Sequence, residues 1–206
     1  LNNLTFSNSA GTIKTINTVG PGSGSIIVNS ILQVGTSTDS AQTVFANDSF
    51  DRIIDVNGDV IITSKGRLWA SDFALFTVGG NWTNSDTFTH WNGTVTFDAP
   101  GTNRTIDSGG TSTAKSFYNV DFNNSSGGWT IQTNNLLVEN NLLLTAASSS
   151  AGAFTLQEGR IIEVRGGFVN SIGGTPTTWT NSTLYLNKTG GGYYTINTKT
   201  GGGDVY

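Results

Sequence analysis

The chain has 206 residues, and Ser, Thr, Gly and Asn together fill 101 of them, whereas charged residues make up only 12%. Ordinary soluble domains carry about twice that charge, but the 35% hydrophobic content supplies a core and excludes a disordered chain. The formal net charge of −4 comes from scattered residues, which excludes the basic stripe that binding to nucleic acid requires.

The abundant residue types favour strands and turns over helices. Gly, Ser, Thr and Asn either carry excess backbone entropy or compete for backbone hydrogen bonds, so helices are disfavoured almost everywhere. The sequence has no cysteine, which excludes disulfides and thiolate metal sites. Because no apolar run approaches the roughly 20 residues that a membrane span needs, we expect no membrane insertion in this segment.

Short apolar runs rich in β-branched and aromatic residues recur along the chain, about every 8 to 12 positions. In chain order, the predicted strands are 60–62, 75–78, 94–97, 105–106, 120–122, 129–131, 142–144, 154–156, 161–164, 184–186 and 194–196. This spacing is typical of either a β-sandwich or a solenoid.

An internal repeat favours the solenoid. Val78–Ser85, with the sequence VGGNWTNS, is matched by Val164–Ser171, with the sequence VRGGFVNS, and each is followed by further strand-like runs that also correspond. A unit that cannot bury its own apolar face gains by stacking on a copy of itself. We therefore predict an all-β fold, a parallel β-solenoid (β-helix) of roughly eight to ten coils.

The repeat also predicts the organisation of the chain. We expect residues 1–206 to form one continuous solenoid segment, built from two imperfect repeats of about 90–115 residues. The first repeat is 1–116, lengthened by an insertion through Phe45 to Thr63, and the second is 117–206.

The two ends of the sequence continue the same pattern. The interval from Ile106 to Phe122 equals the interval from Ile196 to Tyr206 and on from Leu1 to Phe6. Neither end resembles a capping repeat. Either the chain is a stretch of a longer tandem array, or copies of it stack head to tail.

Three of the runs carry a family resemblance. Val78–Ser85, Gly93–Phe97 and Phe117–Val120 resemble tandem β-strand-repeat surface proteins of bacteria and archaea, which are filamentous adhesin-like β-solenoids. The resemblance covers most of residues 60 to 206. It implies an extracellular location, and it implies no catalytic residue.

Catalytic constellations are sparse. His90 is the only histidine, and it stands without the Gly-x-Ser-x-Gly motif of a serine hydrolase. Asp98, Asp107 and Asp121 are spaced to fall on successive strands or corners, where paired acids could serve a polysaccharide lyase or hydrolase. They are equally well explained as solvated turn residues.

One acidic cluster suggests a calcium site. Asp48, Asp51, Asp55 and Asp59 lie close together in the sequence, and calcium accepts carboxylates in flexible geometry. The spacing does not match an EF-hand loop, and Asp is a common turn residue. Calcium is the only cofactor that the sequence suggests.

Trp82 and Trp91 are candidates for stacking on glycans, because an indole presents a flat apolar face. The alternative, which we favour, is that tryptophans stack on one another inside the core of a solenoid.

Nine Asn-x-Ser/Thr sequences are candidate glycosylation sites, since such sequences at turns project outward. The acceptor residues are Asn3, Asn47, Asn81, Asn92, Asn103, Asn123, Asn124, Asn181 and Asn187.

Together these features predict a non-catalytic, extracellular structural protein that forms a cell-surface filament or stalk. Its expected partners are copies of itself or adjacent repeats, joined end to end. The alternative is an adhesin or carbohydrate-binding module on the same scaffold, and a polysaccharide lyase or hydrolase is a further alternative.

Overall fold

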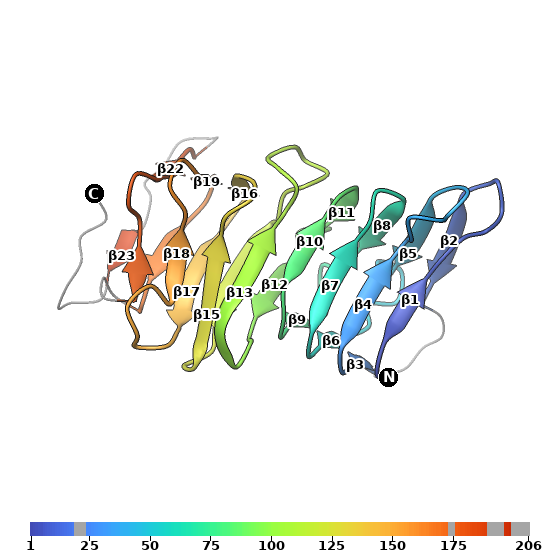
Figure 1. Ribbon diagram of the computed structural model, residues 1–206, viewed down its shortest axis with the longest axis horizontal. Helices are drawn as coiled ribbons and strands as arrows, with labels where there is room; N and C mark the ends of the chain where they lie inside the picture. Colours follow the sequence, from blue (N-terminus) through green and yellow to red (C-terminus); the bar gives the residue numbers. More distant parts are fainter. Residues whose placement is uncertain (19–23, 173–175, 189–195, 199–206) are drawn as a thin grey trace.

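The apolar runs of the sequence form short strands that wind into a parallel β-solenoid, which confirms the predicted fold class. The structure is a computed structural model that describes residues 1–18, 24–172, 176–188 and 196–198. These residues contain no helix, and so none that could cross a membrane. Figure 1 shows the strands stacked side by side along the long axis of the molecule.

The strands pair in parallel and form four sheets. In spatial order, the first sheet contains β1 (Leu4–Phe6), β4 (Ile31–Val34), β7 (Asp59–Ile62), β10 (Trp82–Asn84), β13 (Gly101–Asp107), β15 (Gly127–Ile131), β18 (Phe154–Leu156) and β21 (Thr177–Thr178). The second sheet contains β2 (Lys14–Asn17), β5 (Thr43–Ala46), β8 (Gly66–Trp69) and β11 (Thr87–Thr89).

The third sheet supplies the last strand of each coil. It contains β3 (Ile26–Val28), β6 (Ile54–Val56), β9 (Phe76–Val78), β12 (Thr94–Phe97), β14 (Asn119–Asn123), β17 (Leu142–Ala146), β20 (Phe168–Asn170) and β23 (Ile196–Thr198). The fourth sheet contains β16 (Leu136–Val138), β19 (Ile161–Val164) and β22 (Thr183–Leu186).

Each coil adds one strand to the first sheet, and the number of residues in a coil varies. Leu32 pairs with Leu4, 28 positions earlier, whereas Trp82 pairs with Val60, only 22 positions earlier. The chain makes about seven turns, slightly fewer than the eight to ten coils predicted from the sequence.

The core is a column of inward-facing side chains that stack from one coil to the next. Along the first sheet, Leu32, Val60 and Trp82 are in register and completely buried. Two coils further on, Trp129 pairs with Phe154, and both are also buried. Apolar burial in water-inaccessible stacks of this kind is the main stabilising contribution to the fold.

The loop between β13 and β14, residues 108–118, lies between the second and fourth sheets and is hydrogen-bonded to a strand of each. In this coil, Phe117 forms only an isolated bridge to Val138, while its buried ring packs against Trp82 and Phe88 at centroid distances of 5.0 and 5.5 Å. The core therefore continues through the break between the two sheets.

Side-chain carbonyls link successive coils at the corners. At six corners an Asn or Asp Oδ1 atom accepts a backbone N–H from the next coil, which supplies an acceptor where the regular ladder is interrupted. These acceptor residues are Asn3, Asp59, Asn81, Asn119, Asn135 and Asn141. The corner role explains part of the high Asn content.

The repeated Val-x-Gly motif marks a close approach between corners. A Cβ atom at Gly80 would lie 2.5 Å from the backbone oxygen of Gly58, and one at the equivalent Gly166 would lie 2.4 Å from that of Asn140. Gly80 follows a strand of the third sheet, whereas Gly166 follows a strand of the fourth. The motif therefore repeats a local corner on two different faces. The division into repeats 1–116 and 117–206 stays a prediction.

Candidate functional site

Five large apolar side chains protrude from the loops that connect the second sheet to the third. Phe50 and Ile53 precede β6, Phe73 and Leu75 precede β9, and Trp91 precedes β12. Because β6, β9 and β12 are neighbours in the third sheet, these loops belong to consecutive coils. We call these five residues, three of which are aromatic, the aromatic ledge. Phe73 is 85% exposed and Trp91 is 46% exposed.

A tight turn holds Trp91 on the ledge. The backbone N–H of Gly93 donates to the carbonyl of His90 at 2.8 Å, and the two central residues, Trp91 and Asn92, have φ angles of 45° and 68°. Positive φ at both central positions is characteristic of a type I′ turn, which normally carries Asn, Asp or Gly there. The ring of Trp91 also packs edge-to-face with Trp69, at a centroid distance of 6.4 Å.

Hydrogen bonds between neighbouring loops fix the rest of the ledge. The hydroxyl of Ser71 donates to Asp51 Oδ1 at 2.6 Å and accepts the backbone N–H groups of Phe73 and Ala74. Asp51 itself has a φ angle of 47°, in the left-handed region. The loops that carry Phe50 and Phe73 are thus tied to each other.

A half-buried polar cluster adjoins Trp91. The imidazole of His90 lies 5.5 Å from the ring of Tyr118, and its Nε2 atom is 3.6 Å from Glu139 Oε2. Ser116 donates to the other carboxylate oxygen of Glu139 at 2.7 Å. Burial lowers the pKa of His90 and outweighs the opposing attraction of Glu139. His90 is therefore held mainly as the neutral imidazole at neutral pH.

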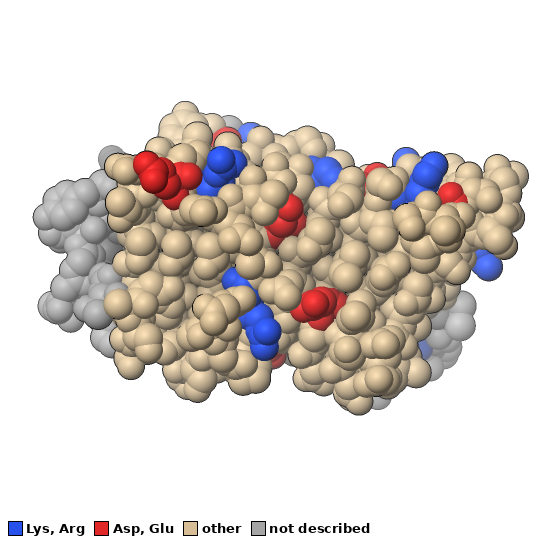
Figure 2. Space-filling view, in the orientation of Figure 1, with Lys and Arg blue, Asp and Glu red and all other residues tan. Residues whose placement is uncertain are grey.

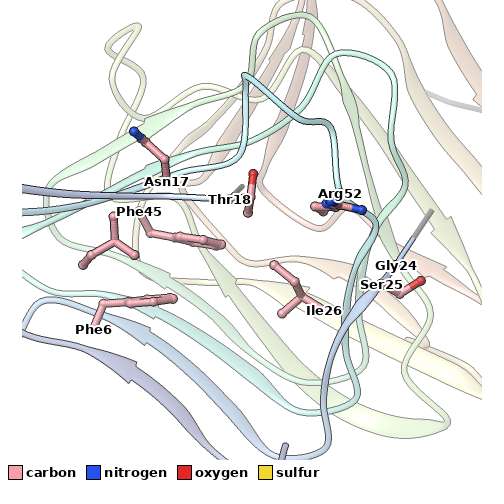
Figure 3. Close-up of a pocket in the computed structure, with 9 residues that line it drawn as sticks. Phe6, Asn17, Thr18, Gly24, Ser25, Ile26, Phe45 and Arg52 are labelled. Atoms are coloured by element: carbon pink, nitrogen blue, oxygen red, sulfur yellow. The ribbon is translucent and has the colours of Figure 1, made fainter. Parts of the chain in front are cut away.

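The N-terminal coil forms a second candidate surface. Strands β1, β2 and β3 each stand at the end of a sheet and pair with one neighbour. Between them lies a cavity of about 490 Å³, with an apolar floor of Phe6, Ile16, Ile26 and Phe45 and a rim that includes Arg52. Figure 3 shows Phe6 and Phe45 stacked there, at a centroid distance of 4.5 Å. The described residues leave this end of the core accessible.

The face that carries the first sheet is sparsely charged. Figure 2 shows only a few separated charged groups on it. Threonines occupy one outward position on four consecutive strands, as Thr105, Thr130, Thr155 and Thr178. Such a face offers hydroxyl groups and no cluster of one charge.

The carboxylates considered for catalysis are divided between two sheets. Asp107 ends β13 in the first sheet, Asp121 is in β14 of the third sheet, and Asp98 follows β12. Burial, and secondarily the negative charge of Asp55, raises the pKa of Asp98. The three carboxylates do not converge on one groove.

The four acidic residues considered for calcium are engaged separately. Asp51 accepts from Ser71, Asp55 accepts from Thr77 at 2.8 Å, and Asp59 accepts from Asn81. Asp48 lies on the loop before β6. Within the described ranges, no group of three or more acidic or histidine side chains is arranged to hold a metal ion.

The two tryptophans considered for glycan stacking differ in burial. Trp82 lies in the core with none of its surface exposed, because β10 directs it inward against Phe88 and Phe117. It cannot meet an external sugar in this fold. Trp91 is on the surface. The sequence did not reveal its companions on the ledge, although the dipeptide Asn92-Gly93 is itself a turn signal.

The nine candidate glycosylation sites fall into three groups. Asn47 is buried, and its side chain bonds to both the N–H and the carbonyl of Arg52. Three half-buried acceptors have hydrogen-bonded amides, namely Asn81, Asn124 and Asn187. The exposed acceptors are Asn3, Asn92, Asn103, Asn123 and Asn181. Only this last group offers a side chain on the surface.

No family model, no curated protein and no solved structure matches the chain. The structure supports the coarser part of the resemblance, a parallel β-solenoid of repeated coils. Membership of the bacterial and archaeal surface-protein family stays a prediction.

Proposed function

We propose that the chain is a non-catalytic structural element of an extracellular filament or stalk, in which the solenoid is continued end to end by a further coil. The observation that carries this proposal is the accessible end of the core at the first coil. The continuing coil comes from a second copy of the chain or from adjacent repeats of the same construction.

The first coil has the properties of an interface. Its three strands, β1, β2 and β3, present backbone N–H and C=O groups on the side that has no neighbouring strand in the described structure. Unpaired strand edges are templates for further pairing. The half-buried side chains of Phe6, Ile16 and Ile26 add an apolar surface to these edges.

Because the strands pair in parallel, a further coil can be added to the end in the same geometry as the coils within the chain. A parallel solenoid has two different ends, so copies that stack do so head to tail, and a head-to-tail contact that does not close into a ring produces a filament. With about 4.8 Å between neighbouring strands, a chain of about seven turns adds roughly 34 Å of rod. Hydrogen bonds and stacked side chains then run along the axis, which suits a mechanical role.

The test uses the purified chain and a tandem fusion of two copies. Sedimentation velocity over a range of concentrations, with electron microscopy, should show rods that lengthen with concentration. The fusion should unfold in one transition at a higher Tm than the single chain. A single chain that stays monomeric together with a fusion that unfolds as two independent units would overturn the proposal.

Adjacent residues on β3 provide a matched pair of variants. Ile26 lines the cavity at the end of the core, whereas Ile27 is exposed on the outer face. Ile26→Glu should prevent rod growth, and Ile27→Glu should not. Circular dichroism of both variants establishes that they fold, and Ile16→Lys replaces Ile26→Glu if the latter unfolds.

A further inference from the structure

We infer that the aromatic ledge binds uncharged saccharide chains, with Trp91 as the main stacking platform. This inference goes beyond the filament function and uses a different surface. The ledge runs along the side of the solenoid, whereas the contact with a continuing coil is at its end. Arg52, between Phe50 and Ile53, borders both surfaces.

Half of the ten exposed large apolar side chains of the described residues lie between Phe50 and Trp91. Large apolar side chains that are exposed singly are normal on protein surfaces, but a contiguous row marks an interaction site. Here five of them lie on loops of three consecutive coils. Paired strands of neighbouring coils are about 4.8 Å apart, so an extended chain laid along these loops can reach side chains of more than one coil.

The backbone holds Trp91 in this position at a cost. Bulky residues with positive φ are rare, and they persist where the surroundings impose them, often at binding sites. Trp91 has a φ angle of 45°, although Gly93 stands only two positions later. The edge-to-face contact with Trp69 further limits the orientation of the indole. The platform is therefore fixed before any ligand arrives, which lowers the entropy cost of binding.

The shape and chemistry of the ledge fit a sugar better than an apolar helix. An amphipathic helix binds in a groove, whereas these side chains lie on the loops that join the second sheet to the third. A sugar ring offers an apolar face of C–H groups to the negative face of an indole, with hydroxyls around its rim. The exposed amide of Asn92 follows Trp91 in the same turn and can bond to those hydroxyls. Tyr118 and Glu139 lie against the preceding residue, His90, and add further polar groups near the turn.

The charged residues on the loops of the ledge favour an uncharged saccharide over an acidic one. The loops of the ledge carry three carboxylates, Asp48, Asp51 and Asp72, and one guanidinium, Arg52. A polyanionic chain laid along the ledge would meet net repulsion. An uncharged chain meets neither repulsion nor the cost of removing counterions.

The experiment measures binding of defined oligosaccharides to the intact chain. The probes are β-1,4-linked hexasaccharides of glucose and of N-acetylglucosamine, with polygalacturonate as the acidic comparison. Isothermal titration and indole fluorescence should detect at least one uncharged hexasaccharide at millimolar concentration or below. Polygalacturonate should bind more weakly.

Variants locate the site. Trp91→Ala should weaken binding by about tenfold, the effect expected from losing one aromatic stacking contact. Phe73→Ser, in the preceding coil, should weaken it by a smaller factor. Tyr185→Ala is the matched control, because Tyr185 is 49% exposed on β22, remote from the ledge. It should leave binding unchanged.

Three outcomes would overturn the inference. These are the absence of binding to both uncharged hexasaccharides, tighter binding of polygalacturonate, and binding that Tyr185→Ala weakens as much as Trp91→Ala does. Rod formation by the Trp91→Ala variant, followed in parallel, separates failure of this inference from failure of the filament proposal. The filament proposal predicts that this variant still assembles.

Discussion

The Oδ1 atom of Asn81 accepts the backbone N–H of Thr105, one coil further along the solenoid, at 2.9 Å. On its other side, Asn81 donates its own backbone N–H to Asp59 at 2.7 Å. Three consecutive coils are therefore linked at one corner by side-chain oxygens. A solenoid whose corners bond in this way has a continuous hydrogen-bond ladder even where the strands end.

Replacing Asn81 tests the corner ladder. Asn81→Ala removes the acceptor for Thr105 and leaves its half-buried N–H unpaired, so we expect a loss of about 1–3 kcal/mol in the free energy of unfolding. Urea denaturation followed by circular dichroism measures it. The control is Asn57→Ala, because Asn57 is exposed and its side chain makes only a 3.3 Å contact with Asn29. Equal losses in the two variants would contradict a special role for the corner.

Gly79 tests the close approach of successive corners. A Cβ atom there would lie 2.6 Å from the backbone oxygen of Asn57, and backbone cannot move aside as a flexible side chain can. We expect Gly79→Ala to cost about 1–3 kcal/mol, the usual range for overpacking. Gly11→Ala should change stability by less than about 0.5 kcal/mol, since a Cβ at Gly11 meets nothing within 4 Å. Thermal unfolding of both variants under one condition checks the difference.

The sequence predicted individual strands better than their assembly. The predicted strands 94–97, 154–156 and 161–164 have the same bounds as β12, β18 and β19, because β-branched and aromatic runs favour extended backbone directly. The prediction for 194–196 falls mostly outside the described residues. The face that each strand joins depends on loop lengths, which vary between coils. For this reason the equivalent motifs at Val78 and Val164 occupy different sheets.

The candidate site was only partly predictable, for a related reason. Trp82 and Trp91 have the same side chain and lie nine positions apart, yet one is in the core and the other on the surface. Burial depends on whether the residue falls on an inward strand position or in a corner. The ledge brings together Phe50, Phe73 and Trp91 from three coils, and sequence spacing alone does not show that these loops coincide.

Because the backbone at Trp91 is strained, we expect a substitution that removes the strain to keep the stability of the fold and to abolish saccharide binding. Trp91→Gly relieves a positive φ angle that costs of order 1 kcal/mol in a residue with a side chain. We expect the variant to have an unchanged or slightly higher Tm and to lose binding of the uncharged hexasaccharides. Asn92→Gly, which relaxes the same turn and keeps the indole, should retain binding. A marked fall in Tm for Trp91→Gly would show that the indole is needed for the fold.

His90 predicts a stability change in weakly acidic solution. Its pKa in the folded chain is lowered by burial, with Glu139 opposing, so the unfolded chain binds a proton more readily than the folded one. The stability that this neutral imidazole contributes is present above the ordinary pKa of 6.5 and is lost as the pH falls through the folded-state value. Because the chain has one histidine, a single imidazole signal in a proton NMR titration reports the folded-state pKa.

Two variants check the origin of the His90 shift. Glu139→Gln removes the opposing attraction, so the pKa of His90 should fall further. His90→Asn keeps an acceptor for the N–H of Asn92, which donates to His90 Nδ1 at 3.0 Å, and removes the titrating group. The pH dependence of stability around pH 6 should shrink in this second variant. A folded-state pKa above 6.5 would contradict the dominance of burial.

Asp98 predicts a pH effect of the opposite kind. Burial and the nearby charge of Asp55 raise its pKa above the ordinary value of 3.8, so the folded chain holds the proton more tightly than the unfolded chain does. The stability linked to this proton is fully present below pH 3.8 and is lost as the pH rises through the folded-state pKa. Asp98→Asn keeps the shape of the side chain without its charge, and we expect a higher Tm than the parent chain at pH 7 and a similar Tm at pH 3. Asp72→Asn is the control, since Asp72 is exposed and its substitution should move Tm little at either pH. A lower Tm for Asp98→Asn at pH 7 would mean that the carboxylate makes a stabilising contact in its charged form, and the burial argument would then fail.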